Sequence, residues 1–176
     1  MRRFVFLVSL VVATVSLTSS LGVMASSSQP LRGQFTAHFG RGAGAPTGSC
    51  APQTFCGLGI LAGFGAATDT LTFTSFEPID DTPCANVTFD EAIQLADGSG
   101  TLVISGEGTF CSPGGSDQAP SSPQDYGHPH TMSATFTVDS AASSGVFAGA
   151  TGSGDKAVTI AGDVGNIRLG GRISLD

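Results

Sequence analysis

The chain is poor in charged residues, in polar aromatic residues and in basic residues. Of its 176 residues only 12% are charged, and it has no tryptophan, one tyrosine (Tyr126) and one lysine (Lys156). The 14 acidic residues outnumber the 7 basic ones and give a net charge of −7. An acidic chain without a basic stripe is repelled by phosphates, which argues against a nucleic-acid partner. The apolar fraction of 40% argues equally against a disordered acidic tail, and the length suits one domain.

The N-terminal segment has the pattern of a secretory signal peptide. Arg2 and Arg3 are followed by an apolar run to about Leu17, and small residues precede a cleavage point after Ala25. The run is short and interrupted by serine and threonine, which argues against a stable membrane anchor. No cysteine follows it, which excludes a lipoprotein anchor. We therefore predict a secreted, extracellular protein with residues 1–25 removed.

The cysteines are even in number, and all of them follow the predicted cleavage point. In an oxidising compartment this favours two disulfides among Cys50, Cys56, Cys84 and Cys111. The spacings contain no C-x-x-C pair, and no histidine lies at zinc-finger distance, so a structural zinc site is not expected. We predict neither a metal nor a cofactor.

Apolar and polar residues alternate with a period of two, which is typical of strands with one buried face. The clearest segments are residues 86–95, 131–138 and 167–176; weaker ones cover residues 33–39, 57–64, 69–77, 101–110 and 155–161. No segment after residue 25 carries a helical stripe of useful length. Turn signals rich in glycine, serine and aspartate separate the eight strands.

This pattern predicts an all-β fold, an eight-stranded antiparallel up-and-down barrel. A barrel is preferred to a sandwich because closure of the sheet leaves no exposed edge. We assign residues 26–31 to a flexible polar leader and residues 32–176 to a single barrel domain. The longest irregular stretch is residues 112–130, rich in proline, serine and glycine.

A glycine-rich segment at residues 144–154, centred on Phe147, carries a family resemblance. It resembles the G-x-F-x-G-A-x-G-x-G turn of secreted bacterial proteins with an allene-oxide-cyclase-like barrel, a fold shared with plant dirigent proteins. The Tyr-Gly-His-Pro sequence at residues 126–129 and the strand end at residues 106–111 are also similar to that group. The chain departs from it at residues 142–145, which read Ala-Ser-Ser-Gly where the group usually has Gly-Gly-Thr-Gly.

The resemblance covers residues 33–176 and implies a barrel of the calycin type. It does not imply cyclase activity, because one fold hosts many functions, and no activity is established for that bacterial group. On physical grounds alone, Phe147 is an apolar side chain in a polar loop, so we expect it to plug one end of the barrel.

Glu91 is the first candidate for chemistry. It is in phase with Phe89 and Ile93, so its carboxylate is expected on the apolar side of the strand. A carboxyl group desolvated there has a raised pKa and can serve as a general acid or base. The alternative interpretation places Glu91 at the barrel mouth or beside an arginine, since a buried charge without a partner is unfavourable.

The histidines and the single tyrosine supply the remaining candidates. His128 and His130 are in phase with the following strand and face the lumen entrance if that strand extends backwards. With Asp125 they form a weak metal-binding pattern, for which two solvated loop histidines are the simpler explanation. We expect Tyr126 to anchor the loop rather than to transfer protons, and His38 to face solvent.

The pairing of the cysteines follows from hairpin register. If Asp97 and Gly98 are the central residues of a type I′ turn, opposed residues have numbers that sum to 195. Glu91 then lies opposite Ile104, and Phe89 lies opposite Gly106, which leaves room for the ring. Cys84 lies opposite Cys111 on the outer face, so Cys50 pairs with Cys56.

Three functions remain open from the sequence. The first is a non-enzymatic secreted barrel that binds a small apolar molecule in its lumen. The second is an isomerase or cyclase of the allene-oxide-cyclase kind, with Glu91 as the acid or base. The third is a structural surface protein with a filled interior; an open or filled lumen decides among them.

Overall fold

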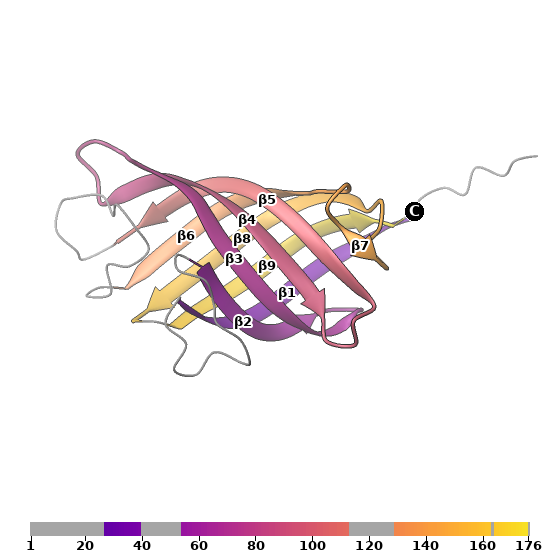
Figure 1. Cartoon of the computed structure of the whole chain (residues 1–176). Coiled ribbons are helices and arrows are strands. Elements are labelled where there is room, and N and C mark those ends of the chain that lie inside the picture. The colour runs from indigo at the N-terminus through magenta and orange to yellow at the C-terminus, as the bar shows by residue number, and fades with distance from the viewer. Residues whose placement is uncertain (1–26, 40–53, 113–128, 163, 176) are drawn as a thin grey trace, which may run out of the picture.

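The computed structural model describes residues 27–39, 54–112, 129–162 and 164–175, which form one closed antiparallel β-barrel (Figure 1). The described residues contain no helix. The strands are β1 (Ser28–Phe39), β2 (Thr54–Leu61), β3 (Gly65–Pro78), β4 (Cys84–Leu95), β5 (Gly100–Cys111), β6 (His130–Val138), β7 (Ser144–Gly145), β8 (Thr151–Ala161) and β9 (Val164–Ser174). The predicted all-β barrel of eight strands is confirmed, with the two-residue β7 as an addition.

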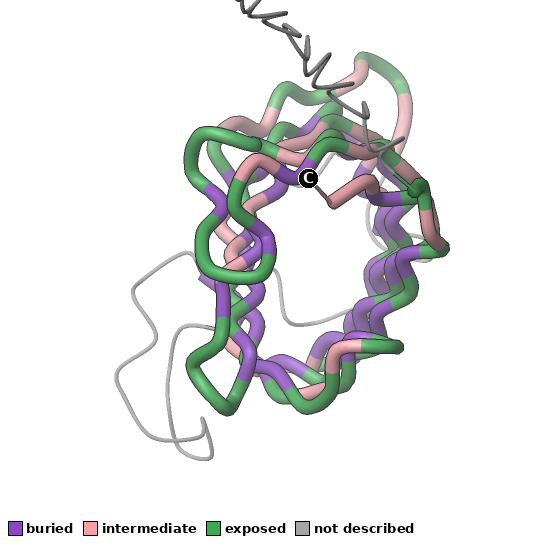
Figure 2. The backbone as a smooth tube through the Cα atoms, turned by 90° about the vertical axis from the view of Figure 1, so that its right-hand side faces the viewer, coloured by how far each residue is buried: buried purple, intermediate pink, exposed green. Residues whose placement is uncertain are grey.

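The eight long strands close into a ring. Each pairs with its neighbours in the order β4-β3-β2-β1-β9-β8-β6-β5, and pairing of β4 with β5 completes the circle. The view along the barrel in Figure 2 shows this ring, with buried and exposed residues alternating along the strands. Alternation of this kind places one set of side chains inside and the other set on the outer wall.

The first strand begins earlier than the sequence pattern indicates. Ser28 pairs with Ser174, and the ladder between β1 and β9 continues to His38. Residues 28–31 therefore belong to the barrel rather than to the flexible leader that we expected. The predicted signal peptide and its cleavage point lie outside the described residues.

Aromatic side chains pack inside one end of the barrel. We call Phe55, Phe73, Phe76, Phe110 and His130 the aromatic cluster. Within it, ring centroids lie 6.1 Å apart for Phe55 and Phe73, and 5.8 Å apart for Phe73 and Phe110. Separations in this range suit edge-to-face packing, which adds stabilisation beyond the burial of apolar area.

The opposite end is closed by a smaller aromatic contact. Phe147, from the turn before β8, is fully buried, and its ring centroid lies 4.7 Å from that of Phe64 in the β2–β3 turn. The predicted plug is therefore confirmed, and its partner comes from across the barrel end.

The β4–β5 hairpin has the predicted register but a different turn. Opposed residues sum to 195, from Cys84 opposite Cys111 to Gln94 opposite Thr101. Gly98 has a positive φ of 75° but Asp97 does not, so the turn is not type I′. Instead Gly98 donates a backbone hydrogen bond of 3.0 Å to Leu95, within a four-residue loop between the strands. Lengthening the loop by one residue on each side leaves the register unchanged.

Two consequences of that register are confirmed. Cys84 and Cys111 form a disulfide, with their Cα atoms 4.0 Å apart. Gly106 lies opposite Phe89, and a Cβ atom on it would come within 2.5 Å of the ring. Cys56 is also disulfide-bonded. Its predicted partner Cys50 lies outside the described residues, so that pairing stays a prediction.

Candidate functional site

Three ionisable side chains meet inside the barrel, between its two aromatic ends. We call Asp69 on β3, Glu91 on β4 and Lys156 on β8 the ionic cluster. Each occupies an inward position in the middle part of its strand, and each residue is no more than 2% exposed. Buried charged residues are rare unless they are paired, and they concentrate at functional sites.

Lys156 and Glu91 are in direct contact across the lumen. Nζ of Lys156 donates a hydrogen bond to Oε2 of Glu91, and the two groups form an ion pair with both side chains fully buried. The ammonium group also lies 4.9 Å from the centroid of the Phe89 ring, a cation–π distance. The lysine is therefore held by one carboxylate and one aromatic face.

Asp69 is the third member, and it lacks an ordinary partner. Both of its carboxyl oxygens and Oε1 of Glu91 are buried and receive no hydrogen bond from any described donor. Burial raises the pKa of Asp69 well above its ordinary value of 3.8; the charge of Glu91 raises it further, while Lys156 lowers it. A proton shared between the two carboxyl groups would satisfy two of these three oxygens.

The sequence pattern identified Glu91 as an inward-facing candidate, but it did not identify Asp69 or Lys156. The inward orientation of Glu91 is confirmed, whereas the alternative of a position at the mouth or beside an arginine is wrong, because the partner is Lys156 in mid-barrel. Asp69 alternates with buried Ala67 and Leu71, and Lys156 alternates with buried Val158. The same test of phase would have placed both of them inside.

His130 faces the interior, as predicted, at the aromatic end. It is 1% exposed, and its ring stacks on Phe110 with centroids 5.1 Å apart. Ser112 Oγ and His130 Nδ1 form a buried hydrogen bond of 2.7 Å. This contact joins the end of β5 to the start of β6.

The other candidates from the sequence are not brought to this site. Tyr126, His128 and Asp125 lie outside the described residues. His38 lies on the same face of β1 as the outward-facing Thr36, as predicted, but its side chain is half-buried rather than exposed. Within the described ranges, no group of three or more histidine, cysteine, aspartate or glutamate side chains could hold a metal ion.

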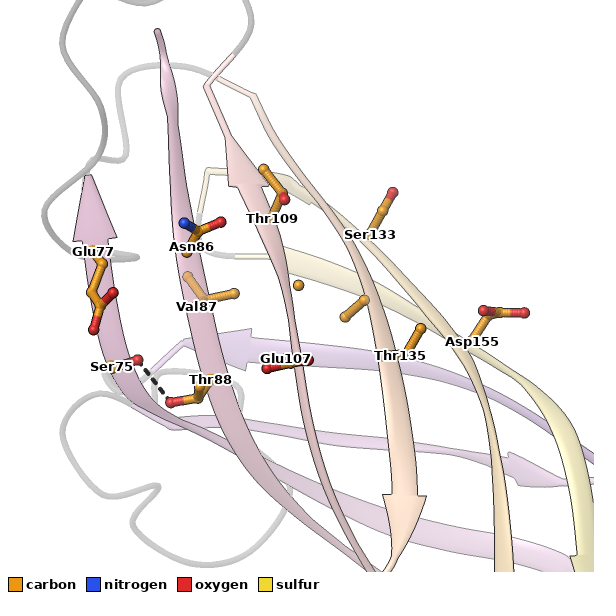
Figure 3. Close-up of a pocket in the computed structure, with 12 residues that line it drawn as sticks. Ser75, Glu77, Asn86, Val87, Thr88, Glu107, Thr109, Ser133, Thr135 and Asp155 are labelled. Carbon is orange, nitrogen blue, oxygen red and sulfur yellow. Dashed lines mark hydrogen bonds between the residues drawn. The ribbon is translucent and has the colours of Figure 1, made fainter. Parts of the chain in front are cut away.

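A polar groove of about 720 Å³ crosses the outer wall (Figure 3). It runs over β3, β4, β5, β6 and β8, and hydroxyl groups line much of it, with the hydroxyls of Ser75 and Thr88 2.8 Å apart. Three carboxylates, those of Glu77, Glu107 and Asp155, also line it, and none of the described lining residues is basic. Such a surface accepts hydrogen bonds and favours cationic or hydroxyl-bearing groups.

Comparisons of the chain with protein-family models, with curated proteins and with solved structures find no match. Within the described ranges, no helix has the length and apolar character needed to cross a lipid bilayer.

Proposed function

We propose that the chain is a secreted surface protein whose barrel is filled by its own side chains and which acts through its outer wall. The observation that carries this proposal is the composition of the interior along its length. The aromatic cluster occupies one end, the ionic cluster the middle, and the contact of Phe64 with Phe147 the other end.

The same arrangement weakens the luminal-ligand hypothesis. A small apolar guest needs an apolar cavity, whereas the centre of this barrel holds two carboxyl groups and an ammonium group. Phenylalanine side chains fill further space inside the barrel, since five of them are buried: Phe35, Phe73, Phe89, Phe110 and Phe136.

A disulfide between strands also suits a protein that leaves the cell. Cys84 and Cys111 join the open end of the β4–β5 hairpin, and such bonds persist in oxidising compartments. The resemblance to secreted bacterial proteins of the allene-oxide-cyclase-like type agrees with export and supports the same assignment.

An isomerase or cyclase is the second candidate, and the ionic cluster favours it. Burial raises the pKa of Asp69, whereas Glu91 is paired with Lys156, so the two carboxyl groups lie in environments that separate an acid from a base. Such an enzyme has to admit its substrate to the barrel centre, where Lys156 and Glu91 are fully buried. Entry of a guest into the lumen therefore distinguishes the candidates.

One experiment tests the interior directly. The mature protein, purified from its own host, is examined by native mass spectrometry and then titrated with an apolar fluorescent probe and with a long-chain fatty acid. We expect no co-purifying small molecule and no saturable probe binding. A stoichiometric guest that is displaced by the fatty acid would overturn the filled-barrel proposal.

A second experiment tests the outer wall. Binding of tagged protein to host cell-envelope fractions is compared between the unmodified chain and a Glu107→Gln/Asp155→Asn variant of the groove. We expect at least a tenfold loss of binding. The matched variant Asp80→Asn/Asp81→Asn removes the same charge from a turn outside the groove lining and should bind normally. Equal binding by all three proteins would contradict a role for the groove.

A further inference from the structure

Lys156 is in an unusual position for the only lysine of a chain. Lysine is normally exposed, yet this side chain is fully buried, in the interior of a protein with no other lysine among 176 residues. Its Nζ touches Oε2 of Glu91, a residue 65 positions earlier in the sequence. An amine and a carboxyl group are thus held together, away from water.

We propose that Lys156 and Glu91 condense to an internal amide bond, with Asp69 as the group that shuttles the proton. The bond joins Nζ of Lys156 to Cδ of Glu91 and ties β4 to β8 across the lumen. The two strands are not neighbours in the sheet, since β5 and β6 lie between them. No hydrogen-bonded ladder could make this connection.

The reaction balances with the groups already present. The amine of Lys156 attacks Cδ of Glu91, a carbon–nitrogen bond forms, and the bond from Cδ to Oε2 breaks. Oε2 leaves as water with two of the three protons of the ammonium group, and the third stays on the amide nitrogen. Asp69 lends its proton to Oε1 of Glu91 in the tetrahedral intermediate and takes it back as the amide forms.

The surroundings of the cluster suit each of these steps. Asp69 keeps its proton to a higher pH than an exposed aspartate, because burial and the charge of Glu91 raise its pKa. Oε1 of Glu91 has no described donor, which leaves it available to that proton. Fixing the two reactants in contact also gives effective molarities on the order of 10⁵–10⁸ M in well-oriented intramolecular reactions.

Burial also favours the product over the ion pair. Two charges removed from water carry a desolvation penalty that their attraction repays only with good geometry and further hydrogen bonds. Here three carboxyl oxygens of the cluster lack such bonds. An amide is neutral, and Asp69, when it carries a proton, can donate a hydrogen bond to the amide oxygen.

Intact mass of the denatured, reduced mature protein tests the proposal first. We expect a mass lower than that of the unmodified chain by one water, about 18 Da. The matched variant Lys156→Met should show no such loss. An unmodified mass for the native chain would overturn the proposal.

Digestion with trypsin gives an independent readout, because the chain has no lysine or arginine between Arg41 and Lys156. An unmodified chain yields peptides 42–156 and 157–168, whereas an acylated Lys156 is not cleaved and yields one peptide, 42–168, that lacks one water. When that peptide is fragmented, backbone cleavage between Asp69 and Glu91 should yield separate fragment ions. Cleavage between Glu91 and Lys156 should yield none, because the amide holds the two pieces together. If fragment ions are absent already from Asp69 onward, Asp69 is the acceptor, and the choice of Glu91 is overturned.

The role of Asp69 has its own test. In an Asp69→Asn variant the amide should form more slowly by a factor of about 100 or more. Uncrosslinked protein then accumulates, and its loss of water can be followed with time. Circular dichroism of the same sample establishes that the barrel is folded. Complete crosslinking of the folded variant at the first measurement would overturn the shuttle.

Discussion

The aromatic cluster and the ionic cluster fill neighbouring parts of the same barrel by different physics. In the aromatic cluster the central rings share several contacts; the ring centroid of Phe73, for example, lies 6.1, 5.0 and 5.8 Å from those of Phe55, Phe76 and Phe110. In the ionic cluster, Lys156 touches one carboxylate, and Asp69 has no described donor. Apolar packing is non-directional and shared among many contacts, whereas a buried charge depends on particular partners. The first region should therefore tolerate conservative change that the second does not.

The largest loss is expected from Lys156→Met. The apolar replacement leaves the Glu91 carboxylate buried without its partner, which typically destabilises by about 3–5 kcal/mol. Denaturant unfolding measures the change. The control is the double variant Glu91→Leu/Lys156→Met, in which no charge of the pair remains, so it should be more stable than the single variant. Equal stability of the single variant and the native chain would contradict the comparison.

A loss almost as large is expected when the disulfide at the aromatic end is removed. Cys84 and Cys111 are 27 positions apart, and closing a loop of that size stabilises by about 3–4 kcal/mol in the chain-entropy model. Thermal and denaturant unfolding of Cys84→Ala/Cys111→Ala measure it. Non-reducing peptide mapping of the native chain provides the check on pairing, since a peptide that links Cys84 to any other cysteine would contradict the register.

Phe110→Leu should have a smaller effect than either. Phe110 contacts Phe76 at 5.5 Å and His130 at 5.1 Å between ring centroids, so a leucine loses aromatic contacts but keeps most of the apolar volume. We expect about 1–2 kcal/mol of destabilisation and a cooperative transition. If this loss exceeded that of Lys156→Met, the aromatic cluster would be the less tolerant region.

The aromatic cluster and the ionic cluster also differ in how far the sequence could predict them. Period-two alternation places side chains inside or outside, and it was enough for Phe110, His130 and Glu91. The register of one hairpin then fixed Cys84 opposite Cys111, because neighbouring strands and a short loop leave little freedom. Local pattern carries this information directly.

The contact of Glu91 with Lys156 could not be predicted in that way. The two residues lie on strands separated by β5 and β6, and their meeting depends on the tilt and stagger of the closed barrel. Those quantities belong to the whole sheet and are not encoded in one segment. Asp69 was missed for a simpler reason, since it lies where the weak predicted strand 69–77 begins, and the true strand starts at Gly65.

The most diagnostic effect, in its dependence on pH, is expected from Asp69→Asn. The folded chain binds the Asp69 proton more tightly than the unfolded chain, because burial, with the charge of Glu91, raises the pKa. The stability from this group is fully present below its ordinary pKa of 3.8 and is lost as pH rises towards the raised folded value. Asparagine cannot titrate, so the free energy of unfolding of the native chain minus that of the variant should decline through this range.

Asp97→Asn provides a control of opposite sign for that experiment. Asp97 is exposed, and hydrogen bonds from Ser99, the backbone N–H first, lower its pKa from 3.8. Its contribution is therefore present above the ordinary pKa and is lost as pH falls, so the difference between native chain and variant should rise with pH. The two difference curves, measured by urea unfolding at closely spaced pH values, should slope in opposite directions. A rising curve for Asp69→Asn would mean that Asp69 is ionised in the folded barrel and shares no proton with Glu91, and the ionic cluster would then carry a net negative charge.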